Sequence, residues 1–337
     1  MPTVTELLRL VKAGGISAAK RAVREADHNH VHVISTSPPV VYMWWGRNDQ
    51  ALHVALRDLP LVVLYLFPWC AEPAEFPQIA QQIKSTLTKF PKHRITFLCN
   101  EEYCVELLNN LGIEALFVNQ NAFVNENVFR PKAIAKTHDA IYSASLAPYK
   151  RHHLAKDIQS LIVLSYSYSG TSPTEYQVRT RKDLAHAWWA KDSLSDDQKI
   201  STEGMVDLYN QARVGLCLSA VEGAMFASME YLLCGMPIVT TKSRGGRAAF
   251  WNENFVITAA DEPKSISKSV QELVERNILP DTIREQTLLK VEAHRNRLRT
   301  YICELGASIE LPWSPGTHGV TSWSNLRVLG KSLRSLN

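Results

Sequence analysis

The amino-acid sequence predicts an α/β fold made of two lobes. Short β-rich runs alternate with stretches of helical length, an order that is typical of a parallel sheet flanked by helices. This order begins a second time near Asp139, after the polar, proline-closed segment Phe123–Pro131. The chain has 337 residues, of which 45% are hydrophobic, so it can bury a separate core in each lobe.

The first lobe opens with an amphipathic pattern. Apolar residues recur at helical spacing from Thr3 to Asp27, with Gly14-Gly15 between them, which predicts a helical hairpin. Three β-rich runs follow, and each of them ends at Pro, Ser or Asn: His30–Ile34, Leu61–Phe67 and Arg94–Cys99. Stretches of helical length separate these runs, so we expect a parallel sheet in this lobe.

The second lobe has a more complete α/β pattern. Its predicted strands are Ala140–Ala144, Leu161–Ser165, Val214–Leu218, Pro237–Thr240 and Phe255–Ile257. Its predicted helices lie near His152–Ser160 and at Thr202–Gln211, Ala224–Cys234 and Pro263–Arg276. A basic helical stretch, Arg284–Leu305, and a short helix near Ser324–Leu333 follow. The length of this tail indicates that it crosses back over the first lobe.

These patterns divide the chain into three parts. We expect an N-terminal lobe at residues 1–131, a C-terminal lobe at residues 132–310 and a tail at residues 311–337. The connection between the lobes is Phe123–Pro131, and we expect the lobes to face each other across a cleft beside it.

Composition and charge exclude several classes of protein. The chain has 37 Lys and Arg against 33 Asp and Glu, and a net charge of +4 is too mild to predict a nucleic-acid partner. The six cysteines contain no CxxC pair, which is typical of reduced thiols in the cytoplasm. No uncharged apolar run reaches the roughly 18 residues of a membrane span. We therefore expect a cytoplasmic protein, with membrane contact only at the surface through its basic helices.

The most informative stretch runs from Gly215 to Thr241. It reads as a strand, a polar turn, a helix stopped by Gly235 and a further strand. In a doubly wound sheet, ligands lie at the turn after a strand's carboxyl end, where a helix N-terminus favours negative charge. A diphosphate therefore fits the turn, and its expected binding residues are Ser219, Gly223, Ala224, Met225 and Phe226.

Two carboxylates accompany this turn. Glu222 and Glu230 are eight residues apart, and on a helix such positions lie within about 80° of each other. Glu222 would lie near a reacting sugar, while Glu230 would accept hydrogen bonds from the two ribose hydroxyls. The alternative is that Glu222 caps the helix and Glu230 lies on a solvated face.

The pattern Ser219-x-x-Glu222-Gly223, the spacing to Glu230 and the ending Leu233–Thr240 together resemble the E-x7-E region of retaining GT-B glycosyltransferases of family GT4. The resemblance covers about Lys136 to Arg276. It implies a GT-B-like fold of two Rossmann-like lobes, in which the C-terminal lobe binds a UDP- or GDP-linked sugar. It also implies transfer with retention of the anomeric configuration.

The segment Tyr142–His152 looks like the strand and loop with which this family brings an Arg and a Lys to the donor diphosphate. Lys150 falls on the lysine position, where a cation would stabilise the charge of the departing nucleotide. Ser145 stands where the family has arginine, and Arg151 is the candidate to supply that charge from a shifted position. The alternative for Lys150-Arg151 is a solvated, basic start of a helix.

Two further features bear on the donor site. The turn Arg244-Gly245-Gly246-Arg247 either offers backbone N–H groups to the ligand or exposes two arginines to solvent, and both interpretations stay open. The chain contains no Asp-x-Asp pair to hold a divalent ion against a diphosphate. We therefore expect neither a metal ion nor a cofactor, as the resemblance also implies.

The first lobe offers weaker candidates. Four histidines could act as acceptor-side bases, although a single histidine is more often structural: His28, His30, His32 and His53. Three tryptophans could stack on a sugar ring, although a place in the core or at a lobe contact is favoured: Trp44, Trp45 and Trp69.

The resulting prediction is a glycosyltransferase that moves a sugar from a nucleotide-sugar to a glycan, lipid-linked or small-molecule acceptor. Glu222 and Lys150 are the expected catalytic residues, and Glu230, Arg151 and the turn after Val214–Leu218 bind the donor. Replacing Lys150 or Glu230 by alanine should reduce turnover and leave the fold intact. One alternative is a catalytically inactive GT-B-like partner subunit, which Ser145 and the short first lobe favour. Another is a nucleotide-sugar epimerase or hydrolase on the same fold.

Overall fold

The computed structural model describes residues 31–36, 39–46, 49–67, 69–165, 174–192 and 200–306. The predicted hairpin at Thr3–Asp27, the predicted helix near Ser324–Leu333 and the tail at 311–337 lie outside these residues, as do His28 and His30.

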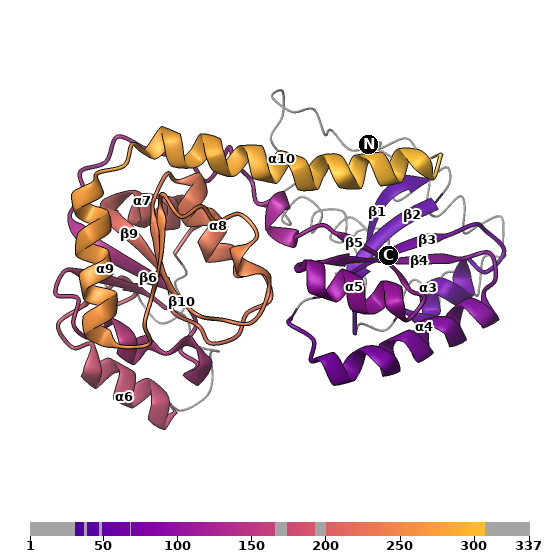
Figure 1. Ribbon diagram of the computed structural model, residues 1–337, viewed down its shortest axis with the longest axis horizontal. Helices are drawn as coiled ribbons and strands as arrows, with labels where there is room; N and C mark the ends of the chain where they lie inside the picture. The colour runs from indigo at the N-terminus through magenta and orange to yellow at the C-terminus, as the bar shows by residue number, and fades with distance from the viewer. Residues whose placement is uncertain are drawn as a thin grey trace. The chain divides into compact units, whose positions relative to one another are not determined.

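The chain forms two compact units, each built on its own sheet (Figure 1). The first unit comprises Met1–Asn125 and Glu292–Asn337, and the second comprises Glu126–Val291. This division differs from the expected one, because the first boundary lies ahead of residue 131 and residues after Val291 belong to the first unit. The cause is helix α10, Pro280–Glu304, whose last turns carry apolar side chains that are buried in the core of the first unit.

The first unit has a five-stranded sheet in the order β1-β2-β3-β4-β5. The strands are β1 Val31–Thr36, β2 Pro39–Trp44, β3 Val62–Leu66, β4 Arg94–Cys99 and β5 Glu114–Phe117. Strands β2 to β5 are parallel, as expected, whereas β1 pairs with β2 in antiparallel orientation. The sequence patterns did not predict β2 and β5.

Both faces of this sheet are covered, and β3 is buried along its whole length. Val63 and Tyr65 face one core with the helices α3 Gln50–Ala55, α4 Phe76–Lys89 and α5 Glu102–Asn110. The alternate residues of β3 face a second core, where α10 contributes Leu298, Tyr301 and Ile302. Side chains alternate between the faces of a strand, so a strand that is apolar throughout needs a cover on each side.

The second unit has a six-stranded parallel sheet in the order β11-β10-β9-β6-β7-β8. The strands are β6 His138–Ser143, β7 Leu161–Leu164, β8 Trp188–Trp189, β9 Ala212–Cys217, β10 Ile238–Thr241 and β11 Val256–Ala259. Its helices are α6 Glu175–Asp183, α7 Thr202–Gln211, α8 Phe226–Leu233 and α9 Pro263–Arg276, besides the first part of α10. Helices α7 and α9 have the predicted bounds.

One predicted helix of this unit is much shorter. In place of a helix near His152–Ser160, the chain forms two short 3₁₀ turns, η3 Pro148–Lys150 and η4 His152–Ala155. Arg151 between them has a φ of 53°, in the left-handed region, so a regular helix cannot pass through it.

The strand order reverses between β6 and β9. From β6 the chain continues to β7 on one side, and from β9 it continues to β10 on the other side. In open α/β sheets, ligands bind at the carboxyl ends of the strands at such a reversal. The segments after β6 and β9 are therefore the place to look for a functional site.

Candidate functional site

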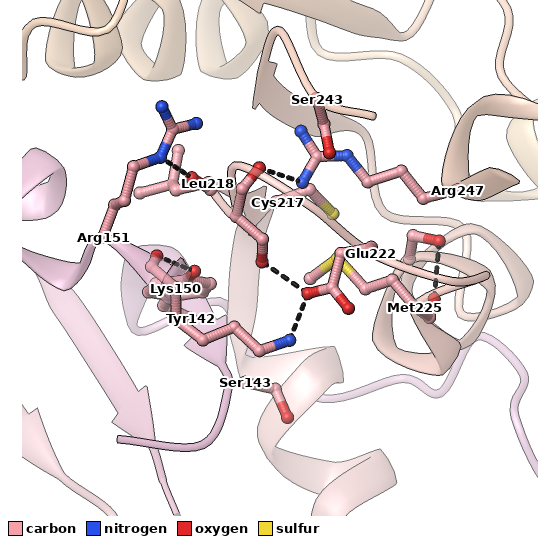
Figure 2. Close-up of polar contacts among 12 residues, drawn as sticks. Tyr142, Ser143, Lys150, Arg151, Cys217, Leu218, Glu222, Met225, Ser243 and Arg247 are labelled. Atoms are coloured by element: carbon pink, nitrogen blue, oxygen red, sulfur yellow. Dashed lines mark hydrogen bonds and ion pairs between the residues drawn. The ribbon is translucent and has the colours of Figure 1, made fainter. Parts of the chain in front are cut away.

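An ion pair joins the two segments at this reversal. Lys150, in η3 after β6, places its ammonium group against the carboxylate of Glu222, in the turn after β9 (Figure 2). Lys150 is 8% exposed and Glu222 is 4% exposed, so the pair is shielded from solvent. This burial excludes the alternative that Lys150 belongs to a solvated basic helix start.

The Glu222 carboxylate has a second partner in the same turn. The hydroxyl group of Ser219, which is fully buried, donates a hydrogen bond to Glu222 Oε1 at 2.5 Å. The position before helix α8 is occupied by Met225, so Glu222 does not cap this helix. Glu222 is thus a buried carboxylate held by one cation and one hydroxyl group.

Helix α8 begins later than predicted. Met225 has a φ of 52°, in the left-handed region, and the first helical residue is Phe226 instead of Ala224. Gly223, Ala224 and Met225 are buried beside Glu222 at the end of β9. The fold therefore brings the predicted turn residues together, although the helical angle between Glu222 and Glu230 does not apply because Glu222 precedes the helix.

Glu230 lies on α8 at the same edge of the sheet. It accepts a 2.7 Å hydrogen bond from the Tyr209 hydroxyl, which lies 3.2 Å from the hydroxyl of Ser143, the last residue of β6. Burial raises the pKa of Glu230 to about 7, against the opposing effect of the Tyr209 hydrogen bond. Glu230 is half-buried, so the alternative of a fully solvated face does not describe it.

The loop after β10 is fastened to the turn after β9. The Glu222 N–H donates to Arg244 O at 3.0 Å, and the Gly246 N–H donates to Gly223 O at 2.6 Å. Gly245 has a φ of 104°, which favours glycine. The predicted alternatives for this loop hold only in part, since Arg244 is exposed while Arg247 is buried. The sequence analysis considered Arg247 only as one of two exposed arginines and did not predict its burial, although the two preceding glycines indicated a close backbone approach.

Arg151 lies at the ends of β9 and β10. Its guanidinium group donates to Leu218 O at 2.7 Å and to Thr241 Oγ1 at 2.5 Å, and it pairs with Asp261 at 2.6 Å. These contacts cross-link neighbouring strand ends, and the carboxylate of Asp261 balances the charge of Arg151.

Two buried rings hold the loop that carries Lys150. The Tyr142 hydroxyl donates to the backbone oxygen of Lys150, and the ring of Tyr142 lies 4.8 Å from that of His152, centroid to centroid. Burial and the nearby Lys150 ammonium lower the pKa of His152 to about 3. His152 is therefore neutral at physiological pH, and its Nδ1 lies 3.1 Å from the Tyr176 hydroxyl. Tyr142 and the neutral His152 therefore hold the loop in place without adding a charge to the site.

The candidates in the first unit fare differently. His53 is 1% exposed and packs against the rings of Phe90 and His93, so it cannot reach an acceptor and its assignment as an acceptor-side base is wrong. Trp44 and Trp45 pack against the two cores, which agrees with the favoured interpretation, whereas Trp69 is 44% exposed.

Within the described ranges, no group of three or more His, Cys, Asp or Glu side chains is arranged to hold a metal ion. None of the helices in the described part of the chain has the length and apolar character needed to cross a membrane.

Part of the chain matches a known protein family. Residues 124–289 match the family model "Glycosyl transferases group 1", and this range contains β6 to β11 with the turns described above. A search of curated proteins found no match.

Several solved structures share the fold. Anabaena Alr3699/HepE in complex with UDP is 12% identical, with a TM-score of 0.56 over 79% of this chain and 78% of its own. A glycosyltransferase from Rickettsia africae is 12% identical, with a TM-score of 0.56 over 80% and 77% of the two chains. Sucrose-phosphate synthase from Thermosynechococcus elongatus is also 12% identical, with a TM-score of 0.54 over 80% and 74%. These likenesses confirm the predicted GT-B-like α/β fold.

Proposed function

We propose that this chain, in which residues 124–289 form a Glycosyl transferases group 1 domain, transfers a sugar from a nucleotide-sugar to an acceptor hydroxyl. The observation that carries the proposal is the buried ion pair between Lys150 and Glu222 at the reversal of strand order. It sets a cation and a carboxylate beside the start of α8, where an activated sugar phosphate would be recognised.

The chemistry follows from where charge develops. When the bond between sugar and diphosphate breaks, the leaving nucleotide gains negative charge, and a cation already in place stabilises the transition state. Lys150 is that cation, and Ser219 and Glu222 fix its position. No side chain is proposed as a covalent nucleophile. Because the sequence resembles the E-x7-E region of family GT4, we further propose that the enzyme is GT4-like, retains the anomeric configuration and works without a metal ion.

Glu230 is proposed to bind the donor ribose. A carboxylate can accept from the two adjacent ribose hydroxyls, and Glu230 lies at the same edge of the sheet as Lys150. Ser219 and the segment Gly223–Phe226 would surround the sugar and its phosphates. The UDP complex of Anabaena HepE supports a UDP-linked donor. A GDP-linked donor is the alternative.

The acceptor is proposed to be a hydroxyl group of a glycan, a lipid-linked sugar or a small molecule. The fold alone does not select among these substrates, since GT-B-like units serve many of them. Candidate acceptors should therefore be screened only after the donor is known.

The test of this function starts with nucleotide binding. Calorimetry on the full chain with UDP and with GDP should show binding of one of them, and a thermal-shift screen of nucleotide-sugars should identify the donor. Product assays with and without acceptors then separate a transferase from a hydrolase or an epimerase. Binding to neither nucleotide would contradict the proposed function and favour an inactive partner subunit.

A further inference from the structure

Among the described residues of the second unit, Arg247 is the most deeply buried cation. It lies in the turn η5 Gly246–Ala248, and its side chain is 1% exposed. Its guanidinium group donates to Ser219 O at 2.9 Å, to Thr240 Oγ1 at 3.0 Å and to Thr241 O at 2.7 Å. Burying a charge is costly unless it is compensated, so the burial of Arg247 indicates a specific role for its charge.

The acceptors of Arg247 are two carbonyl groups and a hydroxyl group, which are all neutral. Two other cations at the carboxyl ends of these strands have carboxylate partners, because Lys150 pairs with Glu222 and Arg151 pairs with Asp261. Among the described residues, no carboxylate forms an ion pair with Arg247. A guanidinium group stays charged at neutral pH, so Arg247 gives the site a positive charge that no direct partner neutralises.

Arg247 also holds the residue on which the ion pair depends. Its guanidinium group binds the backbone oxygen of Ser219, and the Ser219 hydroxyl binds Glu222, which in turn holds Lys150. Figure 2 shows Arg247 on the far side of Glu222 from Lys150. A shift of Arg247 would therefore be transmitted through Ser219 to both charged groups of the pair.

We propose that Arg247 is a positioning residue that fixes the Ser219–Glu222 turn and supplies the uncompensated positive charge with which the site attracts a nucleotide diphosphate. This inference rests on the proposed function. It concerns the phosphates alone, because a buried charge acts on other charges across several ångströms but not on a neutral ribose or base.

The experiment compares the binding of a nucleoside diphosphate with the binding of its nucleoside. Calorimetry measures the Kd of UDP and uridine, and of GDP and guanosine, for the full-length wild type and for Arg247→Gln and Arg247→Lys. Arg213→Gln is the matched control, because Arg213 is exposed at the other end of β9. Thermal unfolding confirms that each variant is folded.

For Arg247→Gln we expect the diphosphate to bind at least about tenfold more weakly, while the nucleoside changes by less than about threefold. Arg247→Lys keeps the charge and should stay within about threefold of the wild type for the diphosphate. Equal losses for diphosphate and nucleoside, or unchanged binding in Arg247→Gln, would overturn this inference but not the proposed function. If Arg247→Gln does not fold, Arg247→Met, which also removes the charge, replaces it with the same expected limits. A wild type that binds neither diphosphate overturns the proposed function and the inference together.

Discussion

The α-carbon of Gly245 lies directly against the backbone of Glu222. A Cβ atom on Gly245 would be 1.5 Å from the carbonyl oxygen of Glu222. Any residue other than glycine at this position would therefore force the backbone to shift. The φ of Gly245, 104°, is also one that other residues rarely adopt. The position of the Glu222 turn therefore depends on the absence of a side chain in a different loop.

Gly245→Ala should accordingly displace the Glu222 turn. We expect nucleotide binding to weaken by more than about tenfold, with a loss of stability of at least about 2 kcal/mol. Gly46→Ala is the control, because Gly46 has a φ of 84° but no atom within 4 Å of the added Cβ, and it should cost only about 1–2 kcal/mol. Denaturant unfolding and calorimetry check both effects. Wild-type nucleotide binding by Gly245→Ala would contradict the coupling of the two loops.

Lys150→Ala should lose stability as well as turnover, contrary to the expectation from sequence that the fold stays intact. The variant leaves the Glu222 carboxylate buried without its cation, and we expect a loss of about 3 kcal/mol. The double variant Lys150→Ala/Glu222→Gln removes the unpaired charge and should recover much of the stability but none of the turnover. Lys156→Ala, at an exposed site in the same segment, should match the wild type. Recovered turnover in the double variant would show that the Lys150 charge is not needed.

Ribose binding should depend on pH through Glu230. Burial raises the pKa of this carboxyl group from 4.5 to about 7, so it is largely protonated at pH 6 and largely ionised at pH 8. The ionised form is the stronger acceptor for both ribose hydroxyls, and uridine or guanosine should bind up to about tenfold more weakly at pH 6 than at pH 8. The nucleoside is the right probe because it has no phosphate that titrates. Glu230→Gln should remove the pH dependence, and an unchanged profile in that variant would exclude Glu230 as its source.

Acid should destabilise the first unit through His53. Burial lowers the pKa of His53 from 6.5 to about 4, so between these values the folded state binds fewer protons than the unfolded state. The free energy of unfolding should therefore fall as pH falls through this range, by up to about 1.4 kcal/mol per pH unit for this group. Urea unfolding at pH 7, 6 and 5 measures the slope. Arg57→Gln, at an exposed site near His53, should keep the wild-type slope. His53→Gln should reduce the slope, and an identical slope in that variant would refute the assignment.

Local signals were enough where they agreed with one another. Helix α7 has an apolar face and begins after Ser201, whose hydroxyl caps the Gly204 N–H, and its predicted bounds were correct. Helix α9 begins at Pro263 and is followed by Asn277 with a φ of 43°, and its bounds were also correct. The predicted helix near His152–Ser160 was wrong, because the chain forms only the 3₁₀ turn η4 there, which ends at Ala155 and is preceded by Arg151 with a left-handed φ of 53°.

The amino-acid sequence by itself determined most strands and helices of the second unit and placed Lys150 and Glu222 in the segments that follow two strands, because hydrophobic periodicity and turn residues are local properties. Only the tertiary structure decided that these two residues, 72 positions apart, form one ion pair, and that Arg247 is buried behind them. It also decided that α10 ends in the first unit. These outcomes depend on which strands become neighbours and which charges lose their water, and both follow from long-range packing that no local pattern records.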